Sequence, residues 1–326
     1  MKRKQSGLRI MSRLIVLVKP LSGFMCLAVL LGVLGFLCAI QITVAGSLTL
    51  LTAAKISGGI AIKTGCICII IFAVLRGFLH YGEQACNHYI AFKLLALIRD
   101  KVFKAMRRLS PAKLEGKDKG NLVSVITSDI ELLEVFYAHT ISPTCIAILT
   151  CLIMLIFIGR YSIWLSLVAL AAYITVGAVI PLVSSRVNKN VGMTYRDGSG
   201  ALSGFVLDSM RGLLESIRYN STDKRLEEMD KKTDELNSLQ DRLKKIEGHT
   251  GAVTDIAIIF FSVAMLLTGI ALYQKGVIGF DGMIVSTVSM MSSFGPVAAL
   301  SGLAGNLTHT LAAGERVLGI LDETPV

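Results

Sequence analysis

Polar side chains recur along a long apolar segment between positions 76 and 88. They are Arg76, His80, Tyr81, Glu83, Gln84 and His88. Four of them follow one another at intervals of four residues, so on a helix they lie along one slowly turning face. Ionisable groups in such a segment normally face a wet cavity or a partner. A histidine there can ligate haem iron or hydrogen-bond a carboxylate.

We call these six residues the polar stripe, and two interpretations of it stay open. In the first, the stripe lines a pathway and contacts cargo. In the second, Arg76 and Glu83 pair with neighbouring helices, and His88 packs near the inner membrane surface.

The element that carries the stripe is one of several long apolar segments. Of the 326 residues, 53% are hydrophobic and 17% are charged, against about a quarter charged in a soluble domain. Crossing a bilayer as a helix takes about 20 apolar residues. Charge-free segments occupy 21–54, 135–159, 161–185, 256–274 and 282–314. With the striped segment from Thr64 to Lys93, they predict an all-α membrane protein with six transmembrane helices. An ordinary cytosolic enzyme, a secreted disulfide scaffold and a disordered chain are excluded.

The distribution of the 33 lysines and arginines predicts the orientation. Six precede the first span, nine lie in 93–119, twelve lie in 186–245, and one is Arg316. The opposite loops hold only Lys55, Lys63, Arg160 and Lys275. Since cationic loops stay cytoplasmic, we expect both termini and both long connections inside a plasma (inner) membrane. The net charge is +10, and the basic residues lie mainly near the ends of the spans. We therefore expect the lipid bilayer as a partner and no nucleic acid.

Three parts are expected along the chain. Residues 1–20 form a cytosolic N-terminus with an interfacial elbow helix that ends at Pro20. Residues 21–312 form the six-helix membrane domain. Residues 313–326 form a linker. The connection 186–247 predicts two helical arms of roughly 25 residues, each about 35–40 Å long.

Each long cytosolic hairpin is predicted to carry a short transverse helix at its tip. Ser110 and Pro111 form a sound helix start, and Gly116 and Gly120 end that helix. In the second connection, Gly212 and Asn220 bracket residues 213–219. Such tips are suited to the grooves of a partner domain. In the sixth span, Gly295 and Pro296 indicate a hinge, and helix packing through Gly302 and Gly305 is the alternative interpretation.

These tips resemble the intracellular loops of ABC exporters. The motifs are Ser110-Pro-Ala-Lys-Leu with Gly120-Asn-Leu, then Gly212-Leu-Leu-Glu-Ser-Ile-Arg, and Ala313-Gly-Glu-Arg-Val-Leu-Gly-Ile-Leu-Asp. The resemblance implies one half of a two-half exporter with two coupling helices that contact ATP-binding domains. The coupling residues it implies are Pro111, Lys113, Leu114, Glu115, Gly120, Gly212, Leu213, Glu215, Ile217 and Arg218.

Within that family, the chain resembles the C-type half of the exporter associated with cytochrome bd assembly. The runs Leu109-Ser-Pro-Ala-Lys-Leu and Tyr81-x-Glu83-x-x-x-x-His88 carry this similarity. It implies haem or a small thiol (cysteine, glutathione) as cargo, His88 as a haem-iron contact, and a non-identical second half, hence a heterodimer.

The sequence contains no phosphate loop of the G-x-x-x-x-G-K-[ST] type. These residues therefore hold no ATPase site and no cofactor of their own. ATP and Mg²⁺ are expected in a nucleotide-binding domain, which either continues the same gene after Val326 or is a separate subunit. The expected function is the permease half of an ATP-driven exporter that works by alternating access. The alternatives are a lipid, drug or peptide exporter half, and a membrane scaffold or sensor that transports nothing.

Overall fold

The computed structural model describes residues 7–17, 19–56, 60–110, 125–301 and 304–323. Throughout these residues the secondary structure is helical and contains no strand. The chain divides into two compact units. The first comprises residues 1–177 and 257–326, and the second comprises residues 178–256.

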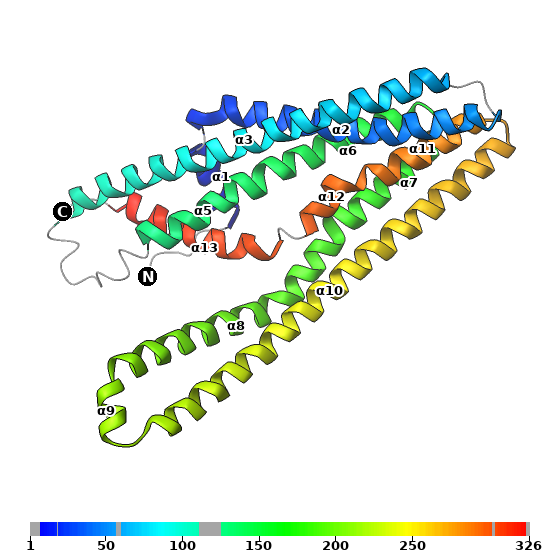
Figure 1. Cartoon of the computed structure of the whole chain (residues 1–326). Helices are drawn as coiled ribbons and strands as arrows, with labels where there is room; N and C mark the ends of the chain where they lie inside the picture. Colours follow the sequence, from blue (N-terminus) through cyan, green and yellow to red (C-terminus); the bar gives the residue numbers. More distant parts are fainter. Residues whose placement is uncertain (1–6, 18, 57–59, 111–124, 302–303, 324–326) are drawn as a thin grey trace. The chain divides into compact units, whose positions relative to one another are not determined.

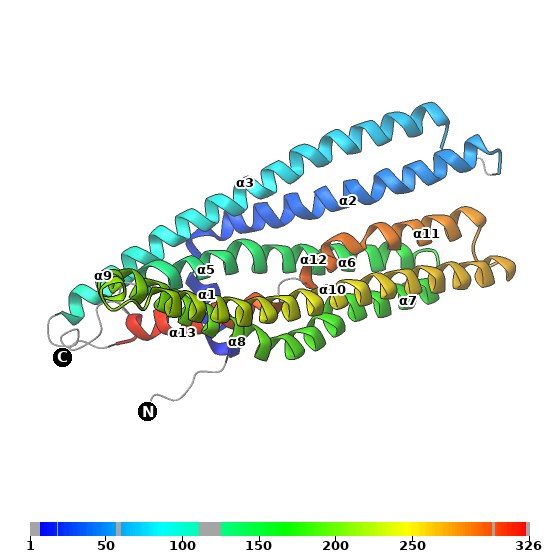
Figure 2. The same ribbon diagram turned by 60° about the horizontal axis from the view of Figure 1, so that its bottom comes forward.

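The first unit packs the ends of the chain against its first spans. α2 (Ser22–Ala53) and α3 (Ile62–Leu109) run side by side (Figures 1 and 2). The other elements that lie wholly in this unit are α1 (Gly7–Leu17), η1 (Lys19–Leu21), η2 (Val125–Asp129), α5 (Ile130–Phe136), η3 (Tyr137–Ile141), α6 (Ser142–Gly159), α7 (Ile163–Ile174), α11 (Phe280–Ser292), α12 (Phe294–Ser301) and α13 (Ala304–Leu321).

The second unit is a helical hairpin, visible in Figure 1 as two ribbons joined by a short turn. Its arms belong to α8 (Ile180–Arg211), which follows the π-helical turn η4 (Thr175–Val179), and to α10 (Thr222–Gln274). The short α9 (Leu213–Arg218) joins them. At 1.5 Å per residue, the 53 residues of α10 extend for about 80 Å. The prediction of long helical arms is confirmed.

Within the described residues, six helices are long and apolar enough to cross a membrane, as the charge-free segments and the striped segment predict. They are Lys19–Ala53, Ile62–Leu109, Ser142–Gly159, Ile163–Arg186, Thr222–Gln274 and Phe280–Leu300. The charge-free segments do not each coincide with a single helix. Segment 135–159 runs from the end of α5 through η3 and α6, and the described residues of segment 282–314 belong to α11, Ser293, α12 and α13.

Prolines explain the π-helical turns η3 and η4 and the break between α11 and α12. A proline in a helix removes the hydrogen bond to the carbonyl four residues earlier and clashes with it. For Pro143 and Pro181 that carbonyl lies within the π-helical turns η3 and η4, respectively. For Pro296 it belongs to Ser292, the last residue of α11. The wider turn or helix end therefore lies where each proline ring would otherwise collide.

Two apolar clusters hold the first unit together. One joins α2, α6, α7, α10, α11 and α12, with Leu165, Met265 and Met290 fully buried. The other joins α1, α3, α5 and α13 through residues such as Leu14, Leu133 and Val317. The hydroxyl of Tyr137 donates to the carbonyl oxygen of Leu14 at 2.7 Å and so fixes α1 to η3. The predicted boundary at 312/313 falls inside α13, so no helix end separates membrane domain from linker.

Gly32 permits a close approach between α2 and α6. A Cβ atom there would lie 2.9 Å from Cγ1 of Ile146 and 3.4 Å from Cδ of Glu83. We expect Gly32→Ala to destabilise the protein by about 1–3 kcal/mol through overpacking, measured as a lower thermal unfolding midpoint. Gly77→Ala is the matched control, because no atom lies within 4 Å of its added methyl group. The double variant G32A/I146A should recover part of the loss; a G32A protein as stable as wild type would contradict the packing.

Candidate functional site

The polar stripe lies on α3, where the structure separates its members by exposure. Arg76, His80, Tyr81 and His88 are exposed, Gln84 is half-buried, and Glu83 is buried. Tyr81 is 76% exposed. The six residues therefore do not form one uniform surface.

Glu83 turns inward and anchors a small polar cluster. Its carboxylate lies 3.1 Å from Nδ1 of His80 and accepts a hydrogen bond from Nδ2 of Asn87 at 3.3 Å. Only 6% of Glu83 is exposed, and Gly32 of α2 leaves the room for it. Sequence reasoning placed Glu83 among the stripe residues but missed Asn87, whose four-residue spacing from Glu83 was the available signal.

One face of α3 changes from open to packed within two turns. Seven residues are close to two turns of helix, so Arg76 and Glu83 point in nearly the same direction. Glu83 is buried, whereas Arg76 is exposed and lies in the apolar, span-forming part of α3. A guanidinium that faces lipid is costly. The open part of this face is therefore suited to a water-filled space or to a second protein subunit.

His88 lies farther around α3 and is also exposed. Its ring stacks on Phe92, with centroids 6.3 Å apart. Among the described residues, no group of three or more His, Cys, Asp or Glu side chains could hold a metal ion. An axial bond to haem needs only one such side chain, and His88 has the exposure for it.

A second polar cluster lies at the break between α11 and α12. Ser293 separates the two helices, two residues before Gly295. Its hydroxyl oxygen lies 2.5 Å from that of Tyr173. The hydroxyl oxygens of Ser292 and Thr43 lie 2.6 Å apart. The predicted hinge residues Gly295 and Pro296 thus lie in the first turn of α12, directly after the break. Sequence reasoning did not find Tyr173 and Thr43, because no local spacing connects them to the sixth span.

α9 is present where the second transverse helix is predicted. Its turn is closed by Ser216, which donates to the carbonyl oxygen of Gly212 at 3.0 Å, and by Asn220 in the left-handed conformation at φ 51°. Four large apolar side chains are exposed around this tip: Leu213, Leu214, Ile217 and Tyr219. Glu215 and Arg218 are exposed beside them. Clustered apolar exposure of this kind marks an interaction surface.

The arms behind α9 are fixed to each other. Arg225 donates to Asp208 at 3.1 Å and to Ser209 at 3.0 Å, and its guanidinium lies 5.5 Å from the ring centroid of Phe205. Farther along, the hydroxyls of Ser184 and Thr250 lie 2.7 Å apart. The first predicted coupling segment, with Pro111, Lys113, Leu114, Glu115 and Gly120, lies outside the described residues.

Comparison with known proteins identifies the family. Residues 21–297 match the family model of the ABC transporter transmembrane region. A probable ABC transporter ATP-binding/permease protein of Haemophilus influenzae is 42% identical over 322 residues, which cover 99% of this chain and 58% of the relative. The chain thus spans little more than half the length of this relative.

More distant relatives differ in their named cargo. The glutathione/L-cysteine transport system ATP-binding/permease protein CydC of Haemophilus influenzae is 22% identical over 78% of this chain and 44% of its own length. An ATP-dependent lipid A-core flippase of Shewanella frigidimarina is 29% identical over 38% of this chain and 20% of its own length.

Proposed function

Because the chain belongs to the ABC transporter transmembrane family and is the membrane domain of an exporter-type transporter, we propose that it couples ATP hydrolysis elsewhere to movement of cargo. The observation that most supports this proposal is α9, a short helix with exposed apolar side chains at the end of a helical hairpin whose two arms are hydrogen-bonded to each other. A nucleotide-binding domain that grips α9 would move both arms together.

The proposed mechanism is alternating access. ATP and Mg²⁺ bind to the nucleotide-binding domains, which the related ATP-binding/permease proteins carry in the same chain. Their closure pushes on α9 and on the first coupling segment, and α8 and α10 transmit the push. The helix break at Ser293, followed by Gly295 and Pro296, supplies a place for the sixth span to bend. Both termini are then cytoplasmic, in a plasma (inner) membrane.

We propose haem or a small thiol as the cargo, bound in part by the exposed members of the polar stripe. The similarity to the cytochrome bd-associated C-type half supports this choice, and one relative is named for glutathione and L-cysteine transport. Arg76 offers a cation for a carboxylate, and His88 offers an imidazole for iron or a hydrogen bond. A non-identical second half would complete the pathway opposite α3.

The cargo proposal predicts a loss of cargo response without a loss of basal ATPase. In the assembled transporter, Arg76→Ala and His88→Ala should each reduce stimulation of ATPase by cargo at least about tenfold, since a charge-assisted contact contributes about 1.5–3 kcal/mol. ATPase is measured with haem, cysteine, glutathione and phospholipid side by side. Val74→Ala, another exposed residue of α3, is the control. An unchanged response in H88A would remove His88 from the site.

A lipid exporter is the second candidate, because one relative is named as a lipid A-core flippase. This candidate predicts stimulation by lipid alone in the same panel, with R76A and H88A behaving like V74A. A membrane scaffold that transports nothing predicts no stimulation by any compound.

A further inference from the structure

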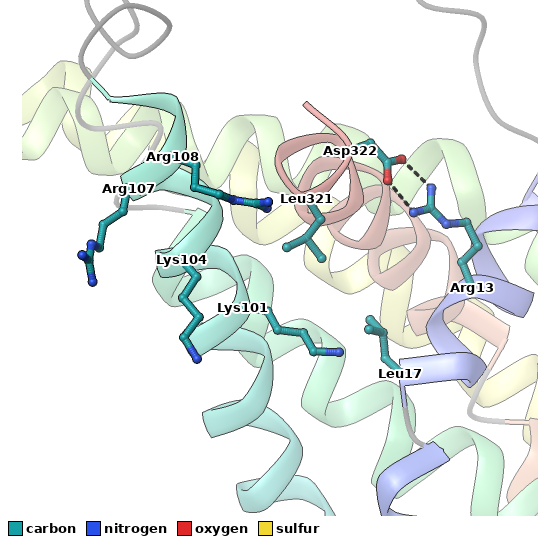
Figure 3. A pocket seen from close by; sticks show the side chains of 8 residues that line it. All are labelled: Arg13, Leu17, Lys101, Lys104, Arg107, Arg108, Leu321 and Asp322. Carbon is teal, nitrogen blue, oxygen red and sulfur yellow. Dashed lines mark hydrogen bonds and ion pairs between the residues drawn. The ribbon is translucent and has the colours of Figure 1, made fainter. Parts of the chain in front are cut away.

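A strongly basic cavity opens between α1, α3 and the end of α13. Its volume is about 780 Å³. The lining residues are Arg13, Leu17, Lys101, Lys104, Arg107, Arg108, Leu321 and Asp322, so five cations face one carboxylate. Figure 3 shows Lys101 and Arg108 extending from α3 towards Leu17 and Leu321, while Arg107 leaves α3 on its other side.

Most of this positive charge is not neutralised within the described part of the chain. Arg13 forms a two-pronged ion pair with Asp322, with both contacts at 2.5 Å. Lys104 pairs with Asp100 one turn away at 2.8 Å. Lys101, Arg107 and Arg108 form no ion pair with any described carboxylate. Lys101 and Arg108 are exposed, extend into the cavity and have no ion-pair partner among the described residues, so they attract an anion with more than one oxygen, such as a phosphate group.

The flank of the cavity is apolar. An adjoining cavity of about 270 Å³ shares Arg13, Leu17 and Leu321 with the first and adds Val16 and Leu318. On the same helix, Ile15 and Val16 are exposed by 48% and 66%, while Leu14 is buried beneath them. α1 therefore presents hydrocarbon beside the cations, only a few residues before the first span begins at Lys19.

We propose that this cavity binds the phosphate headgroup of an anionic membrane lipid, with the acyl chains lying along Ile15 and Val16. Lys101 and Arg108 hold the phosphate, and the Arg13–Asp322 pair closes the side of the cavity between α1 and α13. A free inorganic anion would satisfy the same cations but would leave the apolar flank uncovered. An anionic lipid would contact both the cations and the apolar flank of the cavity.

The test measures lipid binding to the assembled transporter in detergent by native mass spectrometry. Dioleoyl phosphatidylglycerol and dioleoyl phosphatidylcholine are titrated into wild type, the charge-removing variant K101Q/R108Q and the charge-conserving variant K101R/R108K. The control K231Q/R242Q removes one lysine and one arginine from exposed positions of α10. A parallel arm adds inorganic phosphate as competitor.

Phosphatidylglycerol should bind wild type more tightly than phosphatidylcholine does. Because each basic side chain near a membrane surface contributes about 1 kcal/mol, K101Q/R108Q should lose at least about tenfold in affinity for phosphatidylglycerol. K101R/R108K, which also guards against a folding defect, and K231Q/R242Q should bind as wild type. Equal phosphatidylglycerol binding by wild type and K101Q/R108Q would overturn the proposal. So would displacement of phosphatidylglycerol by millimolar inorganic phosphate, which would assign the site to a free anion.

Discussion

Replacing Leu214 and Ile217 together by aspartate is expected to reduce cargo transport at least about tenfold. Both residues belong to α9, and they are 78% and 59% exposed, respectively. Apolar anchors at the centre of an interface typically contribute 2 kcal/mol or more each, and a buried carboxylate without a partner costs further free energy. Transport is measured in proteoliposomes with ATP outside.

Basal ATPase separates this prediction from a general defect. The variant should still fold and hydrolyse ATP, but cargo should no longer change the rate of hydrolysis. Leu207→Asp is the control, because Leu207 is a 50% exposed leucine of α8 that lies before α9 and outside it. If L207D and L214D/I217D lose transport to the same extent, the special role of α9 is wrong.

Removing the cation from the Arg316–Asp129 ion pair is expected to cost about 2 kcal/mol or more of stability. Asp129 is 2% exposed, and its Oδ2 atom has no hydrogen-bond partner among the described residues. Arg316 of α13 binds its other oxygen. Arg316→Ala therefore leaves the buried carboxylate of Asp129 without its cation, and an uncompensated buried charge is strongly destabilising. Because the side chain of Arg316 is 56% exposed, water screens the pair, and the expected loss of stability is smaller than for a fully buried ion pair.

Thermal unfolding of the purified transporter checks this pair. R316A should lower the midpoint by several degrees, and R316K should lower it less because the charge is kept. The double variant D129N/R316A should recover most of the loss, since no buried charge remains. A double variant less stable than R316A would contradict the interpretation.

The six spans could be predicted from the sequence because hydrocarbon tolerates so few charges. The segment 161–185, for example, has 25 residues without a charge, which is the length of a membrane-spanning helix and far longer than a spanning strand. The exact breaks could not be predicted so well. Pro143 indicates a distortion, but whether the helix bends, ends or widens into a π-helical turn depends on the neighbours that pack against η3.

The polar stripe shows where local periodicity stops being informative. Spacing placed Arg76 and His80 on one helix face, and both are exposed. The same spacing did not reveal that Glu83 is buried, because its burial depends on Gly32, about 50 residues earlier in the chain. Similarly, the contact of Tyr173 with Ser293 joins residues 120 positions apart. Side chains whose partners lie on distant helices need the tertiary structure.

The basic cavity illustrates the same point for charge. In the sequence, Lys101 and Arg108 belong to a cationic run that indicates cytoplasmic orientation. Only the packing of α1 and α13 beside α3 turns that run into a cavity with an apolar flank.

Photo-crosslinking from position 214 tests the central claim most directly. A benzoylphenylalanine at this position of α9, introduced into the assembled transporter in membranes, contacts whatever receives the tip of the hairpin. The proposed coupling predicts an adduct with the nucleotide-binding domain whose yield changes when ATP is added. An active transporter that forms no such adduct, or forms it only with lipid, would contradict the account.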